Sequence, residues 1–284
     1  MITGQELAAW REHAPWSSDL MVEQDFLLSK SVAAIFEDDF LRGQVAMRGG
    51  TVLHKGHLAP ASRYSEDIDL VLTGDRPPKH IERALKRVLG FLGEPSESVV
   101  TTMQLAVRNL VAKSKIVRTT YTYDPTSNDA ALAHLKIEVN TSERENHFGL
   151  VPVSIIVPGE PGGTRTTEVQ SYDLNEMLGT KLRALLQREH GRDLFDLWWA
   201  YKVCSLSRAS SKLSPELVGQ AFRFYMRQEG SSFNAAEVKR ELDRRMNSKK
   251  FLRDMDGYLP VGKQYDPREA FEDFCQVFLP HIDG

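Results

Sequence analysis

The chain has 284 residues, a formal net charge of −3, 26% charged residues and 41% hydrophobic residues, a composition typical of a globular protein with one large or two modest domains. The charge argues against a protein that coats nucleic acid with its whole surface, although a local basic patch is compatible with it. No stretch approaches the ~20 apolar residues of a membrane span, and the N-terminus lacks a signal-peptide pattern. We therefore expect a cytoplasmic protein with no membrane partner.

The first 92 residues are expected to alternate between helices and strands. Residues 1–40 are predicted to be helical, because apolar side chains recur there at the spacing of a buried helix stripe. Residues 44–48 and 67–73 are expected to be strands. Residues 77–92 are expected to form a helix that opens on two prolines, which the first helical turn tolerates. The pattern predicts a mixed sheet that starts early in the chain.

Two acidic residues open the second of these strands. Side chains two positions apart on a strand share a face, so Asp67 and Asp69 lie together while Ile68 points the other way. Hard divalent cations are held by carboxylate oxygens together with substrate phosphates. An Asp-x-Asp pair can also be a solvated strand edge. Because apolar residues continue the strand, we favour a metal seat at the start of a buried strand.

A glycine turn precedes the acidic pair. Gly49-Gly50-Thr51 is followed by a predicted short helix at residues 52–57, and both features can bring backbone N–H groups close to a phosphate. A Gly-Gly pair alone is more often a plain turn. In the order Gly-Gly-Thr, helix, Ser-x-Asp-x-Asp, the elements together favour metal-dependent phosphoryl chemistry.

Further strands are expected in the middle of the chain. Residues 99–110 and 114–123 are predicted to pair as a hairpin, and residues 134–140 alternate between polar and apolar side chains. The alternation places Glu138 on the polar face, where it is a candidate third carboxylate that binds metal or acts as a base. A half-exposed strand with solvated charges explains the pattern equally well, and both interpretations stay open.

Beyond residue 172 the pattern is helical almost to the end. Asp173 is expected to cap a helix at residues 174–188, with Glu176 completing a capping box. Gly191 fits a left-handed position between this helix and the next. An α/β part followed by helices predicts the α+β class, with a division near residue 170.

Two segments carry an excess of cations. Residues 108–118 contain four cations and no anion, and residues 238–253 contain seven cations against two anions. Such runs are usually solvated helix faces. They can also bind a polynucleotide backbone, since Lys and Arg supply most phosphate affinity. The two interpretations remain open.

The chain resembles a known family in two places. Residues 47–72 are similar to the first motif of the polymerase-β-like nucleotidyltransferases, in which a Gly-Gly or Gly-Ser turn precedes Asp-x-Asp. The segments 181–188 (KLRALLQR) and 192–197 (RDLFDL) resemble a second motif, that of the AbiEii/AbiGii toxin family, which includes the MenT toxins. The resemblance covers roughly residues 22–203. It implies a nucleotidyltransferase-type mixed sheet flanked by helices in residues 1–170 and a helical domain in residues 171–284.

The resemblance also implies roles for individual residues. Asp67 and Asp69, with Glu138 as a further candidate, would hold Mg²⁺ or Mn²⁺. Lys181 would contact the phosphates of a nucleoside triphosphate (NTP) substrate and neutralise the leaving pyrophosphate, and Asp193 would orient Lys181 or assist the nucleophile. The remaining nucleotide-binding candidates are Gly49, Gly50, Thr51, Arg63 and Ser65. Asp196 is expected to pair with an arginine or to stabilise its helix.

The function implied by the family is that of a toxin with a cognate antitoxin. It would transfer nucleotides from an NTP to an RNA acceptor, and the MenT resemblance implies the 3′ end of tRNA, so that translation and growth stop. Two alternatives are kept. One is nucleotide transfer to a protein or a small molecule, and the other is a nucleotide-binding interaction module without turnover.

Overall fold

The computed structural model describes residues 2–107, 110–126, 132–160, 162–206 and 213–283, with residues 102–107 and 110–114 described by their backbone alone. In this part of the chain no helix is long and apolar enough to cross a membrane.

A mixed sheet of seven strands forms one part of the molecule, with the order β3-β4-β5-β2-β1-β7-β6. The strands are β1 (Val45–Arg48), β2 (Asp67–Leu72), β3 (Glu97–Val107), β4 (Leu110–Tyr123), β5 (Ala133–Asn140), β6 (Leu150–Pro158) and β7 (Thr164–Tyr172). Strand β2 lies between β1, to which it is antiparallel, and β5, to which it is parallel. The strand that begins with the two acids is therefore central in the sheet.

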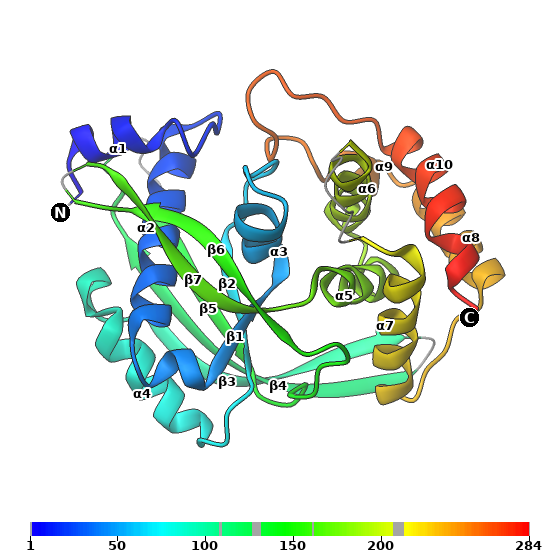
Figure 1. Ribbon diagram of the computed structural model, residues 1–284, viewed down its shortest axis with the longest axis horizontal. Helices are drawn as coiled ribbons and strands as arrows, with labels where there is room; N and C mark the ends of the chain where they lie inside the picture. Colours follow the sequence, from blue (N-terminus) through cyan, green and yellow to red (C-terminus); the bar gives the residue numbers. More distant parts are fainter. Residues whose placement is uncertain (1, 108–109, 127–131, 161, 207–212, 284) are drawn as a thin grey trace.

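Helices lie beside the sheet and follow it in the chain. Figure 1 shows α2 and α4 beside the strands, α5 to α10 gathered on the opposite side of the molecule, and α3 between these groups. The longer helices are α1 (Gly4–Trp10), α2 (Asp19–Glu37), α4 (Pro78–Val88), α5 (Leu174–Gln187), α6 (Gly191–Leu206), α7 (Pro215–Gln228), α8 (Ala235–Arg245) and α10 (Pro267–Val277). The short helical turns are η1 (Leu41–Gly43), α3 (Gly49–Val52), the π-helix η2 (Leu53–His57), η3 (Gly90–Leu92), α9 (Lys249–Leu252) and η4 (Leu279–His281).

The predicted alternation on β2 is confirmed and explains how the acids reach the surface of the sheet. Ile68 and Leu70 are buried in the core, whereas Asp67 and Asp69 are only half-buried on the other face. One cluster of buried apolar side chains runs from α2 through the strands to α5–α10. The α+β class is confirmed.

Two local expectations are corrected by the structure. Strand β4 already begins at Leu110, so the predicted break at residues 111–113 is wrong. Asp173 does cap α5, but Glu176 forms no capping box. Its buried carboxylate accepts hydrogen bonds from the backbone N–H groups of residues 147 and 148 and from the hydroxyl of Tyr225. These tertiary donors replace the local one.

Gly191 is needed for a different reason from the one expected. It does not have a positive φ, and it starts α6. A Cβ at this position would lie 2.1 Å from the carbonyl oxygen of Phe251. Close packing of α6 against the α9 segment, rather than a left-handed helix end, therefore requires the glycine.

Candidate active site

The acidic pair lies in a row of charged residues across the sheet. Asp69 is directly opposite Arg48 on β1 and Glu138 on β5, and Asp67 is opposite Lys136 on β5. Lys136 Nζ lies 2.8 Å from Asp67 Oδ2. The two acids thus share one face of the central strand, as predicted, and a cation already contacts one of them.

The glycine turn lies against Asp69. Gly49 has φ of +82°, and a Cβ there would be 2.0 Å from Asp69 Oδ2. A Cβ on Gly50 would be 2.7 Å from Arg63 Nη2 and 3.0 Å from Ser65 Oγ. Both glycines are therefore required by close approach, and the first also by its backbone conformation.

Thr51 connects the turn to the acidic strand. Its hydroxyl donates to the carbonyl oxygen of Asp67 at 2.7 Å, and Thr51 Oγ1 lies 2.9 Å from Ser65 Oγ. The Gly-Gly-Thr turn, Ser65 and the start of β2 form one hydrogen-bonded unit, which places the predicted phosphate-binding residues beside the predicted metal seat.

A buried ion-pair cluster joins this unit to the helices. Asp196 on α6 is fully buried and accepts from Arg63 Nε at 2.6 Å and Nη2 at 2.8 Å. Lys181 Nζ on α5 lies 2.7 Å from the Asp196 carboxylate, and His54 Nε2 lies 2.8 Å from it. Burial opposes ionisation, but Arg63, Lys181 and His54 together hold the pKa of Asp196 well below its usual value.

His54 is neutral in this cluster. Burial lowers its pKa to about 4. Since a carboxylate can only accept, Nε2 carries the proton and donates to Asp196, and Nδ1 accepts from the hydroxyl of Ser62 at 2.8 Å. The sequence identified no role for His54, because none of its contacts follows from local spacing.

Asp193 holds Lys181 from a second direction. It is fully buried and lies 3.3 Å from Lys181 Nζ, while Arg188 donates to both of its oxygens at 2.8 and 2.9 Å. Burial raises the pKa of Asp193, but Arg188 and Lys181 outweigh this and lower it. The lysine ammonium is therefore fixed between two carboxylates.

A cavity of about 160 Å³ brings the sheet and the helices together. Its lining includes Gly49 and Asp69 from the sheet side, Lys181 from α5 and Arg188 at the C-terminal cap of α5. Arg48 and Arg183 also line it, and both donate to Glu143. A small cavity lined by two acids, Asp69 and Glu143, and four cations can bind phosphate groups together with a divalent cation.

Comparison with known proteins agrees with this geometry. The family model described as nucleotidyl transferase AbiEii toxin, type IV toxin–antitoxin system, matches residues 31–277. The chain belongs to the AbiEii toxin family. As a member it is a nucleotidyltransferase with a nucleotide substrate and an antitoxin partner.

A solved structure supports the fold. MenT4, a nucleotidyltransferase toxin from Mycobacterium tuberculosis, aligns with a TM-score of 0.52 over 99% of this chain and 89% of its own, at 12% sequence identity. No curated protein matches by sequence. At this identity the likeness shows a shared fold.

Two carboxylates of this AbiEii toxin are placed so that they could bind a hard divalent cation. Asp67 and Asp69 share one face, and the ammonium of Lys136 on Asp67 shows that this position attracts a cation. Within the described residues, no three His, Cys, Asp or Glu side chains are arranged to hold a metal ion. Glu138 instead accepts from Arg118 Nε at 2.7 Å, so its assignment as a third metal ligand stays a prediction.

Arg63 is placed differently from a surface nucleotide ligand. It is 4% exposed, it donates to Asp196 through two nitrogens, and its third donates to the carbonyl of Tyr64. Its predicted contact with the nucleotide stays untested, while the expected Arg-pairing of Asp196 is present.

None of the described cations of the two basic segments lines the 160 Å³ cavity. The run at residues 108–118 lies largely outside the described side chains. In residues 238–253, four of the seven cations contact acids of the same segment or the next turn: Lys239, Arg244, Arg245 and Arg253. Local pairing weakens the case for this helix as a phosphate-binding surface.

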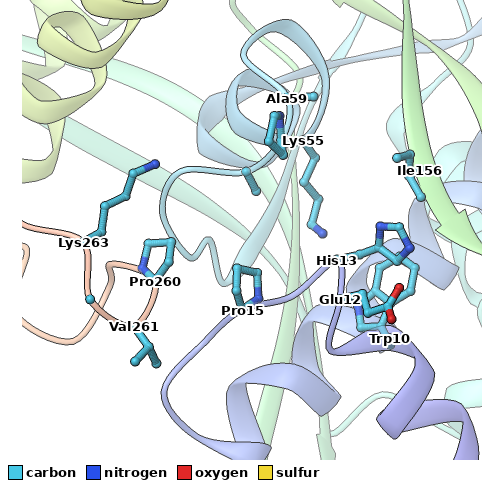
Figure 2. Close-up of a pocket in the computed structure, with 13 residues that line it drawn as sticks. Trp10, Glu12, His13, Pro15, Lys55, Ala59, Ile156, Pro260, Val261 and Lys263 are labelled. Atoms are coloured by element: carbon cyan, nitrogen blue, oxygen red, sulfur yellow. The ribbon is translucent and has the colours of Figure 1, made fainter.

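A larger cavity, of about 520 Å³, lies away from the acids. Figure 2 shows it between Trp10 and His13 of the N-terminal segment, Lys55, and the loop that carries Pro260 and Lys263. None of the predicted site residues lines it.

Asp67 should make the stability of the metal-free toxin depend on pH. Burial and the charge of Asp69 raise its pKa from 3.8 to about 6, although Lys136 opposes the shift. The pKa of Asp67 is higher in the folded state than in the unfolded state. Protonated Asp67 therefore contributes fully to the free energy of unfolding below about pH 4, and this contribution is lost as the pH rises through about 6. Between about pH 5 and pH 7.5, the melting temperature of wild type should therefore fall more than that of Asp67→Asn. Thermal unfolding of both proteins in a chelator measures this, and parallel profiles would contradict it.

Proposed function

We propose that this AbiEii toxin is a cytoplasmic Mg²⁺- or Mn²⁺-dependent enzyme that transfers a nucleotide from an NTP to an RNA acceptor, the 3′ end of tRNA, and so inhibits translation and growth. The observation that carries the chemistry is the cavity in which Asp69 and the Gly49 turn meet Lys181. The acceptor follows from the resemblance of the motifs to those of MenT toxins. Residues 1–170 would supply the acids and residues 171–284 would supply Lys181 and Asp193.

Asp67 and Asp69 would hold the divalent cation on the face of β2. When bound, such an ion neutralises phosphate charge and lowers the pKa of an acceptor hydroxyl. The backbone N–H groups of the turn at residues 49–51 would bind the triphosphate, and Ser65 would donate to one of its oxygens. This arrangement would hold the α-phosphate against the acidic strand.

Lys181 would neutralise the leaving group. The acceptor hydroxyl would release its proton to solvent as its oxygen forms a new P–O bond at the α-phosphorus. The bond to the bridging oxygen of the β-phosphate would break, and pyrophosphate would leave with the negative charge. Lys181 lines the same cavity as Asp69, and Asp193 and Asp196 fix its ammonium before substrate arrives. Such preorganisation costs no rearrangement when the charge develops. Asp193 is fully buried, so it would orient Lys181 rather than touch the nucleophile.

The charge around the cavity supports a polyanionic substrate. Lys181, Arg48, Arg183 and Arg188 line it together with two acids, Asp69 and Glu143. The excess of cations would favour binding of a triphosphate, and Arg groups can contact phosphate oxygens in pairs.

Labelling of tRNA tests the proposal. Purified toxin is incubated with total tRNA, Mg²⁺ and each α-labelled NTP in turn, beside Asp67→Asn. Wild type should label tRNA, and the variant should lose about 100-fold or more of this rate, because several kcal/mol of charge stabilisation disappear. Asp243→Asn on the exposed surface of α8 is the matched control and should retain the wild-type rate.

The other outcomes identify the alternatives. Label on a protein or a small molecule, and none on tRNA, would replace the proposed acceptor with one of those. Nucleotide binding without any transferred label would support an interaction module. In that case Asp67→Asn would leave growth inhibition unchanged.

A further inference from the structure

We infer that Lys136 is a resident counter-ion of the metal seat, which holds Asp67 when no divalent cation is present and has to leave it for a metal ion to bind. The inference rests on the proposed function, because it concerns the same pair of acids. It assigns Lys136 a gating role: the cation binds well only when an NTP arrives with it.

The sheet register aims Lys136 at Asp67. The two residues are direct partners on the parallel strands β5 and β2, and Nζ lies 2.8 Å from Oδ2. The ammonium thus contacts one of the carboxylate oxygens that a divalent cation would need as a ligand. The Lys136 side chain is 35% exposed, so it can swing away without opening the core.

The second acid of the pair differs in its surroundings. In the described part of the chain no ion pair involves Asp69, although it lines the cavity beside Gly49 and Lys181. Asp69 is available to a cation, whereas Asp67 is engaged. A metal ion therefore competes with an ammonium for one of its two carboxylates.

The displaced ammonium has an acceptor on its own strand. Glu138 is two residues along β5, on the same face as Lys136. Arg118 donates to Glu138 Oε1 at 2.7 Å, and no described residue donates to Oε2. Glu138 then receives the lysine instead of binding the metal. After Lys136 has moved to Glu138, Asp67 and Asp69 contact the metal ion and Glu138 contacts Arg118 and Lys136, so every carboxylate on this face has a cationic partner.

Nucleotide binding would tip the competition. When only two carboxylates bind the divalent cation, the displacement of Lys136 lowers the affinity. The phosphates of an NTP add further oxygen ligands and offset this loss. We therefore expect weak binding of the free metal ion and tighter binding of the metal–NTP complex. The acids would be kept from capturing a metal ion without substrate.

Calorimetric titration of Mn²⁺ into the 284-residue chain without nucleotide tests the inference. Lys136→Met keeps the apolar stem and removes the charge, and it should bind Mn²⁺ about 10-fold tighter than wild type, equivalent to about 1.4 kcal/mol. Lys136→Arg retains a cation opposite Asp67 and should stay near the wild-type affinity. Lys115→Met removes an exposed charge from β4 and is the control for a general effect of net charge.

The possible results separate the two proposals. The inference is overturned, although the metal site is retained, if Lys136→Met binds Mn²⁺ no more tightly than wild type does. It is also overturned if Lys115→Met raises the Mn²⁺ affinity as much as Lys136→Met does. If wild type binds no Mn²⁺ even with a non-hydrolysable NTP analogue, the metal-dependent function fails and the inference with it. If Lys136→Met does not fold, two other affinities decide. The inference is supported when Lys136→Arg binds Mn²⁺ with the wild-type affinity and the NTP analogue raises the Mn²⁺ affinity at least 10-fold. It is refuted when the analogue does not raise that affinity.

Discussion

Replacing Asp196 with alanine should destabilise the protein by about 3–5 kcal/mol and lower its melting temperature by roughly 5–8 °C. The substitution removes the carboxylate that Arg63, Lys181 and His54 share. Arg63 is buried and would lose both of its hydrogen bonds to a carboxylate, so an uncompensated cation would remain in the core. Thermal unfolding with circular dichroism measures the shift.

An exposed acid provides the matched control for this prediction. Asp243 pairs with Lys239 one turn away on α8, and both side chains are about half exposed. Asp243→Ala should cost less than about 1 kcal/mol, because solvent screens such pairs. If Asp196→Ala shifts the melting temperature no more than Asp243→Ala does, the buried cluster does not hold the fold together.

Gly49→Ala should reduce nucleotide transfer by about 100-fold while the protein stays folded. The added Cβ would lie 2.0 Å from Asp69 Oδ2, so the carboxylate has to move from its place beside the turn. A displacement of about 1 Å at a catalytic group can produce a loss of this size. The positive φ adds a strain of roughly 1–2 kcal/mol for any residue with a Cβ. Initial rates of tRNA labelling and a thermal melt on the same sample separate the two effects.

Gly93→Ala shares the strain without the clash. Gly93 has φ of +86°, and a Cβ there would meet nothing within 4 Å. This variant should lose only the stability that the backbone strain costs, and it should keep the wild-type rate. If both variants lost activity equally, backbone strain rather than displacement of Asp69 would be the cause.

The parts of the site that depend on local spacing could be predicted from the sequence. The two-residue period of a strand placed Asp67 and Asp69 on one face, and the structure confirms this through the burial of Ile68 between them. The order of turn, helix and strand predicted that Gly49 lies near the acids, and the pairing of Arg48 with Asp69 across β1 and β2 brings it there. The first statement concerns residues within one strand, where geometry follows from periodicity, whereas the second depends on the pairing of two strands.

The buried cluster could not be predicted in this way. Asp196 meets Arg63 across 133 positions and His54 across 142 positions, and no periodic pattern connects such distant residues. Glu176 shows the same limit: its spacing from Asp173 suits a capping box, yet tertiary donors from the segment before β6 and from α7 engage it. Local rules describe what a residue can do, and packing between distant segments decides among the possibilities.

The buried position of Asp196 also limits how the chain can be divided. A fragment that ends at Tyr172 would keep Arg63 and His54 but lose the carboxylate that both of them contact. The complementary fragment would keep Asp196 with Lys181 alone of its three partners. The first piece would leave the buried guanidinium of Arg63 without its carboxylate, so we expect the sheet to need the helices of the same polypeptide in order to fold.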